Sequence, residues 1–150
     1  MAPLANGTSA PSIDGLDLDA APTALFFYKV TCPVCQMAAP KVGSMAEAYP
    51  GQIVGIGQDP AERLDAFADE HGMGFPSASD PPPYPASRAY HVETVPTLFV
   101  IDARGTIVEM VESWDRAGYN RASRTLGGLV GLAYHEVSEE GDGLPAFRPG

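Results

Sequence analysis

The apolar residues of this chain occur in two kinds of pattern, which predict an alternation of strands and helices. Short, nearly continuous apolar runs predict buried strands over residues 24–30, 52–58, 75–79, 97–101 and 106–112. Apolar residues at helical spacing predict helices over residues 33–49, 60–71, 86–90 and 115–133. This order predicts an α/β sandwich with a central mixed β-sheet and helices on both faces.

Proline residues mark several of the places where these elements begin, bend or end. Asp59 can cap a helix that starts at Pro60. Pro40 lies inside the helical pattern of residues 33–49 and should kink that helix. The segment DPPPYP, residues 80–85, predicts an extended surface loop, because consecutive prolines fix φ and remove backbone donors.

Length and composition predict one domain with loosely structured ends. At 150 residues the chain can bury a core without disulfide bonds. We expect a lead-in over residues 1–22, a folded domain over 23–134 and a mobile tail over 135–150, which is rich in glycine, proline and acidic residues. No apolar stretch has the length of a signal peptide or a membrane span. The sequence therefore predicts a cytoplasmic chain, or an extracytoplasmic one if a leader has been removed.

An excess of acidic side chains disfavours partners that carry negative charge. The chain has 19 Asp and Glu against 9 Lys and Arg, which gives a formal net charge of -10. This charge repels nucleic-acid phosphates and anionic lipid surfaces. We therefore expect a soluble monomer that binds neither nucleic acid nor membranes.

The only two cysteines, Cys32 and Cys35 in the stretch VTCPVCQ, carry the candidate chemistry. Two such residues make half of a zinc site, but the histidines that would complete it are scattered singly. A disulfide that closes so small a loop removes little chain entropy and is a poor staple. Exchange of electrons is the interpretation that we favour, with no metal and no cofactor expected.

The position of the pair between a strand and a helix favours redox chemistry. A helix N-terminus presents free N–H groups and the positive end of the macrodipole, which favour a thiolate at Cys32. Lys29 lies close in sequence and adds positive potential. Cys35, one turn into the helix, would be shielded from solvent yet able to attack a mixed disulfide formed on Cys32.

The stretch TVPT, residues 94–97, supports the same interpretation. Its proline lies at the mouth of a predicted strand, where it cannot donate to a central ladder. A cis Val95–Pro96 bond would turn the backbone toward Cys32. The carbonyl and N–H of Val95 would then be exposed and could pair with an extended substrate peptide.

Four stretches together resemble the thioredoxin superfamily: FFYKVTCPVC, Pro40 in the next helix, VPT before a buried strand, and the hairpin VID-x-x-G-x-I-V. Residues 51–80 are similar to the helix-strand insert of the TlpA/ResA-like branch, also described as redoxin or AhpC/TSA-like. The resemblance covers roughly residues 10–133. It implies a thioredoxin-like sandwich with a TlpA-type insert, and a thiol-disulfide oxidoreductase that acts on protein substrates.

The resemblance also implies roles for individual residues. Cys32 would be the exposed nucleophile, Cys35 the resolving thiol and Pro96 the cis-proline of a substrate groove. The remaining residues expected to bind substrate are Tyr28, Thr31, Pro33, Val34 and Val95. Tyr28 and Thr31 stand where many relatives carry tryptophan, and the Pro33-Val34 pair lies where relatives tune the redox potential.

One departure from the family concerns proton transfer to and from the second cysteine. Relatives commonly carry an acidic residue at one of two positions, which are Phe26 and Ala38 here. Neither side chain can act as a base, so water, Glu93 or the surroundings of Cys35 must serve.

Several functional alternatives remain open at this stage. A thiol peroxidase of the peroxiredoxin type shares the fold, but the Thr three residues before its cysteine is replaced by Lys29 before Cys32. A redox-inert binding module, or a carrier that holds Cu(I) between two thiolates, is the non-enzyme alternative. For an oxidoreductase, the expected partners are a protein with a disulfide or dithiol and an upstream reductase or oxidase.

Overall fold

The computed structural model describes residues 2–150, and its elements follow the predicted order. The strands are β1 (Thr23–Tyr28), β2 (Ile53–Gly57), β3 (Ser77–Ser79), β4 (Thr97–Ile101), β5 (Ile107–Glu112), β6 (Trp114–Asp115) and β7 (Phe147–Arg148). The helices are α1 (Pro33–Ala48), α2 (Ala61–His71), α3 (Pro85–Ala89) and α4 (Arg116–Val130). None of these helices, within residues 2–150, is long and apolar enough to cross a membrane.

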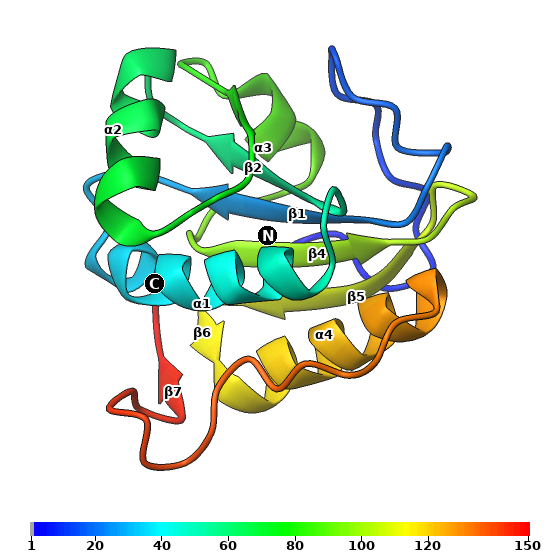
Figure 1. Cartoon of the computed structure of the whole chain (residues 1–150). Coiled ribbons are helices and arrows are strands. Elements are labelled where there is room, and N and C mark those ends of the chain that lie inside the picture. Colours follow the sequence, from blue (N-terminus) through cyan, green and yellow to red (C-terminus); the bar gives the residue numbers. More distant parts are fainter. Residues whose placement is uncertain (1) are drawn as a thin grey trace.

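Five strands form a central mixed sheet in the order β3-β2-β1-β4-β5 (Figure 1). β1 and β2 are parallel, as are β2 and β3, whereas β4 is antiparallel to both of its neighbours. The short strands β6 and β7 form a separate antiparallel pair. The mixed sheet and its order confirm the predicted thioredoxin-like α/β architecture.

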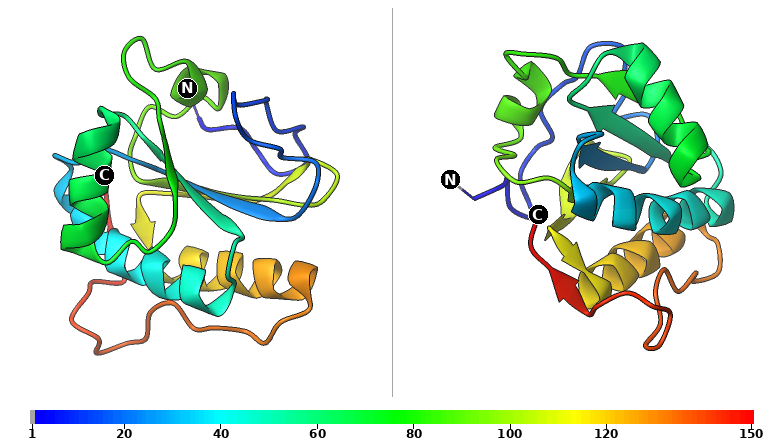
Figure 2. Two further views of the ribbon diagram at one scale, coloured as in Figure 1. Left: turned by 45° about the horizontal axis from the view of Figure 1, so that its top comes forward. Right: turned by 90° about the vertical axis from the view of Figure 1, so that its left-hand side faces the viewer.

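Helices cover both faces of this sheet, as predicted. α1 and α4 lie side by side on one face, and α3 lies with the N-terminal segment on the other face (Figure 2). α2 contributes Leu64 and Phe67 to the same apolar cluster as α1. A second, separate cluster lies on the opposite face of the sheet, so that each face has its own hydrophobic core.

The central strand β1 shows why the apolar runs have no polar interruption. Phe26 and Tyr28 belong to the core beneath α1 and α4, whereas Leu25 and Phe27 belong to the core on the opposite face. All four side chains are fully buried. A strand covered on both sides needs apolar residues along its buried length, and β1 has them from Ala24 to Tyr28.

The C-terminal residues 135–150 differ from the mobile tail that the sequence predicts. Val137 and Ser138 are buried. The backbone N–H groups of both residues donate to the side-chain oxygen of Asn120 in α4, at 2.8 and 3.1 Å. Composition favoured disorder here, but one buried apolar side chain and an amide partner on α4 hold the segment in place.

Asp142 ties this segment to two helices. Its carboxylate pairs with Lys41 of α1 at 2.9 Å and with Arg116 of α4 at 3.5 Å. It also accepts hydrogen bonds from the Ser138 hydroxyl and the Leu144 N–H. These hydrogen bonds and the Lys41 ammonium hold the pKa of Asp142 well below its usual range. The C-terminal segment therefore runs along α1 and α4 with defined polar contacts.

We expect the substitution Gly43→Ala to destabilise the fold. A Cβ at Gly43 of α1 would collide with the carbonyl oxygen of Gly72, which ends α2. Overpacking against backbone costs about 1–3 kcal/mol. Gly128→Ala in α4 is the matched control, because a Cβ there meets no atom within 4 Å. Urea unfolding should show a loss for Gly43→Ala only, and equal effects of the two changes would contradict this packing.

Candidate active site

Cys32 occupies the N-cap of α1, where the turn after β1 enters the helix. Its backbone is extended, with φ -85° and ψ 115°, and Pro33 follows as the first helical residue. Proline suits that position because its missing N–H would have no partner there. The Cys32 sulfur accepts the N–H of Cys35 at 3.1 Å. A sulfur thus takes the place of the oxygen that usually caps a helix.

Two side chains that the sequence analysis did not assign to the site hold the turn before Cys32. Asp59 accepts the N–H of Val30 at 2.9 Å, and the amide of Gln36 donates to the Val30 carbonyl at 2.9 Å. Asp59 was expected to cap α2, but the N-cap is Pro60, with no side-chain cap bond. β1 and β2 are parallel, so their carboxyl ends lie at the same edge of the sheet. The predicted order of strands could therefore have indicated that Asp59, which follows β2, lies beside Val30, which follows β1.

The two thiols differ sharply in their environment. Both cysteines are free; Cys32 is half-buried and Cys35 is fully buried. The hydrogen bond from the Cys35 side chain does most to lower the pKa of Cys32, to about 6, and the N–H groups of Cys35 and Val34 add to it. Burial raises the pKa of Cys35 far above its ordinary value. Near neutral pH the site therefore holds one reactive thiolate and one protonated partner.

The Val95–Pro96 stretch lies directly beside the Cys32 sulfur. The peptide bond between these residues is cis. The sulfur lies 3.5 Å from the carbonyl oxygen of Val95. Phe27 of β1 pairs with Thr97 of β4, so that the strand before Cys32 and the strand after Pro96 are adjacent. The sheet therefore brings the two motifs, which are far apart in sequence, to one edge.

Two residues expected to touch substrate lie in the interior instead. Tyr28 is fully buried, its ring stacks between Phe26 and Phe67, and its hydroxyl lies 2.7 Å from the Ser77 hydroxyl. Val34 is only 5% exposed and belongs to the core. Both expectations were wrong for the same reason. The side chains of Tyr28 and Val34 point into the core between α1 and the sheet and not toward solvent.

Three of the other expected site residues lie at or near the surface around the sulfur. Thr31 and Pro33 flank Cys32 and are exposed, and Val95 is half-buried. Pro96 is buried. The structure thus brings together Cys32, Cys35, Val95 and Pro96, with Thr31 and Pro33 at the rim.

Tyr119 is a buried polar group near the thiols, and no motif in the sequence assigns it to the site. Its hydroxyl has no hydrogen-bond partner within residues 2–150. Burial raises its pKa, and negative charge on Cys35 or Cys32 raises it further. Phe26 and Ala38, where relatives carry an acid, are fully buried and apolar. Tyr119 is therefore a neutral hydroxyl on the buried side of the site.

The end of the chain also reaches the site. β7 pairs with β6, and the N–H of Gly150 donates to the Ser113 hydroxyl at 3.1 Å. A Cβ at Gly150 would collide with the carbonyl oxygen of Val95. The positive charge of Arg148 contributes to the lowered pKa of Cys32. No local pattern in the sequence indicates these contacts, because they depend on how residues 135–146 are held.

Comparison with known proteins establishes the family. The model of the AhpC/TSA family matches residues 6–110. The chain belongs to the AhpC/TSA family. No curated protein sequence matches it. The match spans both cysteines and Pro96, and it confirms the resemblance on which the expected fold was based.

Solved structures place this AhpC/TSA-family chain among thioredoxin-like proteins. A secreted Mycobacterium tuberculosis (MTB) disulfide oxidoreductase, homologous to E. coli DsbE, is 26% identical, with a TM-score of 0.55 over 63% of this chain and 70% of that one. MTB DsbF is 25% identical, with a TM-score of 0.63 over 80% and 95%. A thiol:disulfide interchange protein from Chlorobium tepidum, at 21% identity and a TM-score of 0.64 over 81% and 97%, shows the same fold. These findings confirm the prediction of a thioredoxin-like disulfide oxidoreductase.

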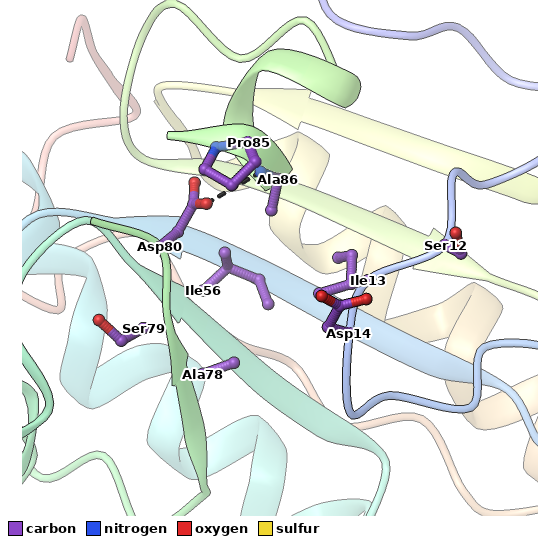
Figure 3. A pocket seen from close by; sticks show the side chains of 9 residues that line it. All are labelled: Ser12, Ile13, Asp14, Ile56, Ala78, Ser79, Asp80, Pro85 and Ala86. Carbon is purple, nitrogen blue, oxygen red and sulfur yellow. Dashed lines mark hydrogen bonds between the residues drawn. The ribbon is translucent and has the colours of Figure 1, made fainter. Parts of the chain in front are cut away.

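A separate cavity lies on the other face of the sheet. It has a volume of about 240 Å³ and is lined by the N-terminal segment, β3 and the start of α3 (Figure 3). Asp80 at its edge already accepts two backbone N–H groups, of Ala86 and Ser87. Ile56 in its wall belongs to the core opposite the thiols.

Within residues 2–150, no group of three or more His, Cys, Asp or Glu could hold a metal ion.

Alkylation of Cys32 should follow its lowered pKa. Because the thiolate is the nucleophile, the iodoacetamide rate should rise with pH around a midpoint of about 6 and fall below it. Cys35→Ala removes the donor that lowers this pKa most, so the midpoint should move to higher pH. Mass spectrometry of the alkylated chain at each pH measures both. An unchanged midpoint in Cys35→Ala would show that the Cys35 side chain does not stabilise the thiolate.

Removal of the Tyr119 hydroxyl should not destabilise the fold. A buried hydroxyl without a partner costs about 1–3 kcal/mol, so Tyr119→Phe should raise the free energy of unfolding by roughly 1 kcal/mol. Tyr90→Phe is the matched control, because the Tyr90 hydroxyl donates to the Pro11 carbonyl at 2.7 Å. That change should cost about 0.5–1.5 kcal/mol. Thermal unfolding that ranks the two variants the other way would show that Tyr119 has a bound water or another partner.

Proposed function

We propose that the chain exchanges electrons with disulfides or dithiols of protein substrates through Cys32 and Cys35. One observation carries the proposal: a half-buried sulfur of lowered pKa caps α1 and accepts the backbone N–H of Cys35, whose own thiol is buried one turn away. The arrangement separates a nucleophile that meets solvent from a partner that does not. Such asymmetry is what a two-cysteine exchange reaction needs.

In the reducing direction the reaction has two steps. The Cys32 thiolate attacks one sulfur of a substrate disulfide, an S–S bond forms to Cys32, and the other substrate sulfur leaves as a thiolate that takes a proton from water. Cys35 then loses its proton and attacks the Cys32 sulfur. The second substrate sulfur leaves, the Cys32–Cys35 disulfide remains, and two electrons have passed to the substrate.

The buried thiol supports the order of these steps. While Cys32 is a thiolate, burial and the shared hydrogen bond keep Cys35 protonated. Once Cys32 is in a mixed disulfide, its sulfur no longer carries the charge that opposes ionisation of Cys35. Cys35 therefore becomes easier to ionise only after substrate has reacted, which is when the Cys32 sulfur carries a leaving group that Cys35 can displace.

The groove that would receive the substrate lies along residues 94–96. The Val95 carbonyl is 3.5 Å from the nucleophilic sulfur, and an extended peptide that pairs with Val95 would present its own sulfur to Cys32. Thr31 and Pro33 are exposed at the rim and would contact the residues on either side. Backbone pairing is tolerant of sequence, so a range of substrates fits.

The direction of electron flow and the partner depend on the redox potential of the pair. The M. tuberculosis neighbour is described as secreted and the Chlorobium one as an interchange protein. For this chain an upstream reductase or oxidase is the expected second partner. A low potential against glutathione would assign reduction, and a high one oxidation. The cytoplasmic location and the monomeric state predicted from the sequence stay predictions.

Substitution of each cysteine tests the proposal. Cys32→Ser should abolish reduction of insulin disulfides, because the nucleophile is lost. Cys35→Ser should accumulate a mixed disulfide with insulin, because nothing resolves it; mass spectrometry would detect this adduct. Stoichiometric Cu(I) binding without exchange would contradict the proposal. Peroxide consumption that persists in Cys35→Ser but not in Cys32→Ser, without insulin reduction, would favour a thiol peroxidase.

A further inference from the structure

The last residues of the chain lie over the part of the groove that a substrate peptide would use. We call residues 147–150 the terminal strap. Its last residue, Gly150, lies so close to the Val95 carbonyl oxygen that a Cβ would collide with it. That same oxygen is 3.5 Å from the Cys32 sulfur. The strap and an extended substrate would therefore compete for the backbone of Val95.

Ser113 links the strap to the cis-proline stretch. Its N–H donates to the Pro96 carbonyl at 2.8 Å, and its hydroxyl accepts the N–H of Gly150 at 3.1 Å. Ser113 has a positive φ of 68°, and it separates β5 from β6. Pro96, which the proposed groove should expose, is buried in this arrangement. Ser113 thus holds Gly150 beside the Val95–Pro96 backbone.

The chain just before the strap is held more firmly than the strap itself. The Trp114 indole donates to the Pro145 carbonyl at 2.8 Å, and the N–H of Arg116 donates to the Ala146 carbonyl at 2.9 Å. The Arg116 guanidinium also donates to the Leu144 carbonyl at 2.7 Å. These contacts fix residues 144–146 against the start of α4.

The strap has much weaker attachments. All four of its residues are exposed, and Phe147 is 58% exposed. Only two residue pairs, Trp114 with Arg148 and Asp115 with Phe147, join β7 to β6. A two-stranded pair of this length has little stability of its own. The strap can therefore leave the groove about Ala146 while the rest of the C-terminal segment stays in place.

We propose that the terminal strap determines which disulfides the site accepts. Small disulfides reach the half-buried Cys32 sulfur directly, whereas an extended protein segment pairs with Val95 only after residues 147–150 have left. The inference rests on the proposed function, since it concerns access to the same sulfur. Binding of an extended substrate is reduced by the fraction of molecules in which the strap is closed.

The terminal strap can lie this close to Val95 only because residue 150 is glycine. The atom that a Cβ would meet is a backbone oxygen of the cis-proline stretch, which cannot rotate away as a side chain can. A methyl group at position 150 therefore displaces the end of the chain and leaves Arg148 and the rest of the sequence unchanged. Gly128→Ala is again the control, because a Cβ there meets no atom within 4 Å.

The test compares two probes on the full chain. DTNB is a small disulfide that needs no backbone pairing, and insulin carries disulfides within extended chains. Both react with the same Cys32 thiolate, so the ratio of the insulin rate to the DTNB rate reports access and not thiolate content. Gly150→Ala should raise this ratio several-fold, about 3- to 10-fold, whereas Gly128→Ala should leave it as in the parent chain.

A second variant, which ends after Ala146, keeps the result interpretable if Gly150→Ala is accommodated by a small shift. It removes the strap but retains the contacts of residues 144–146, and its ratio should rise at least as far. Equal ratios in the parent chain and in both variants would overturn the inference while insulin reduction itself upholds the proposed function. A parent chain that reduces neither probe would contradict the proposed function and, with it, this inference.

Discussion

The hydrogen bond from the Cys35 N–H to the Cys32 sulfur, at 3.1 Å, is the interaction on which the rest of the site depends. A helix start must find acceptors for its free N–H groups, and in this protein the acceptor is the sulfur that we propose as the nucleophile. The hydrogen bond to the Cys32 sulfur therefore does two things at once. It caps the first turn of α1, and it stabilises the thiolate that the proposed chemistry needs. Each charge state of the sulfur therefore affects both the helix start and the reactivity.

This contact requires that the turn between β1 and α1 be rigid. Asp59 and Gln36 hold Val30 from two sides, and β1 itself is buried on both faces. On the other side of the sulfur, the position of residues 94–96 is set by β4, which begins at Thr97 and pairs with β1. The sheet thus places both the proposed nucleophile and the backbone of the proposed groove.

The sequence predicted the parts of this arrangement that are encoded locally. The order of elements follows from apolar runs and helical spacing, and the two cysteines with Val95 and Pro96 were found from motifs that each span a few residues. Tyr28 and Val34 were assigned to the groove by family position, but the direction of a side chain depends on which face a helix covers. The same limit applies to Asp59, whose partner Val30 is far away in sequence, and to residues 135–150. Their composition is typical of disorder, and contacts with residues far away in sequence, among them Asn120, Lys41 and Trp114, give them a fixed course.

The pairing of Phe27 with Thr97 has a consequence for the speed of the reaction. Because a strand ladder fixes the separation between the sulfur and the Val95 carbonyl, the entropy of aligning the proposed nucleophile with the backbone proposed to bind substrate is lost when the protein folds. A bound chain then meets the nucleophile at a high effective molarity. The sheet that carries both groups need not reorganise around the substrate; only the segments that lie over the groove have to move.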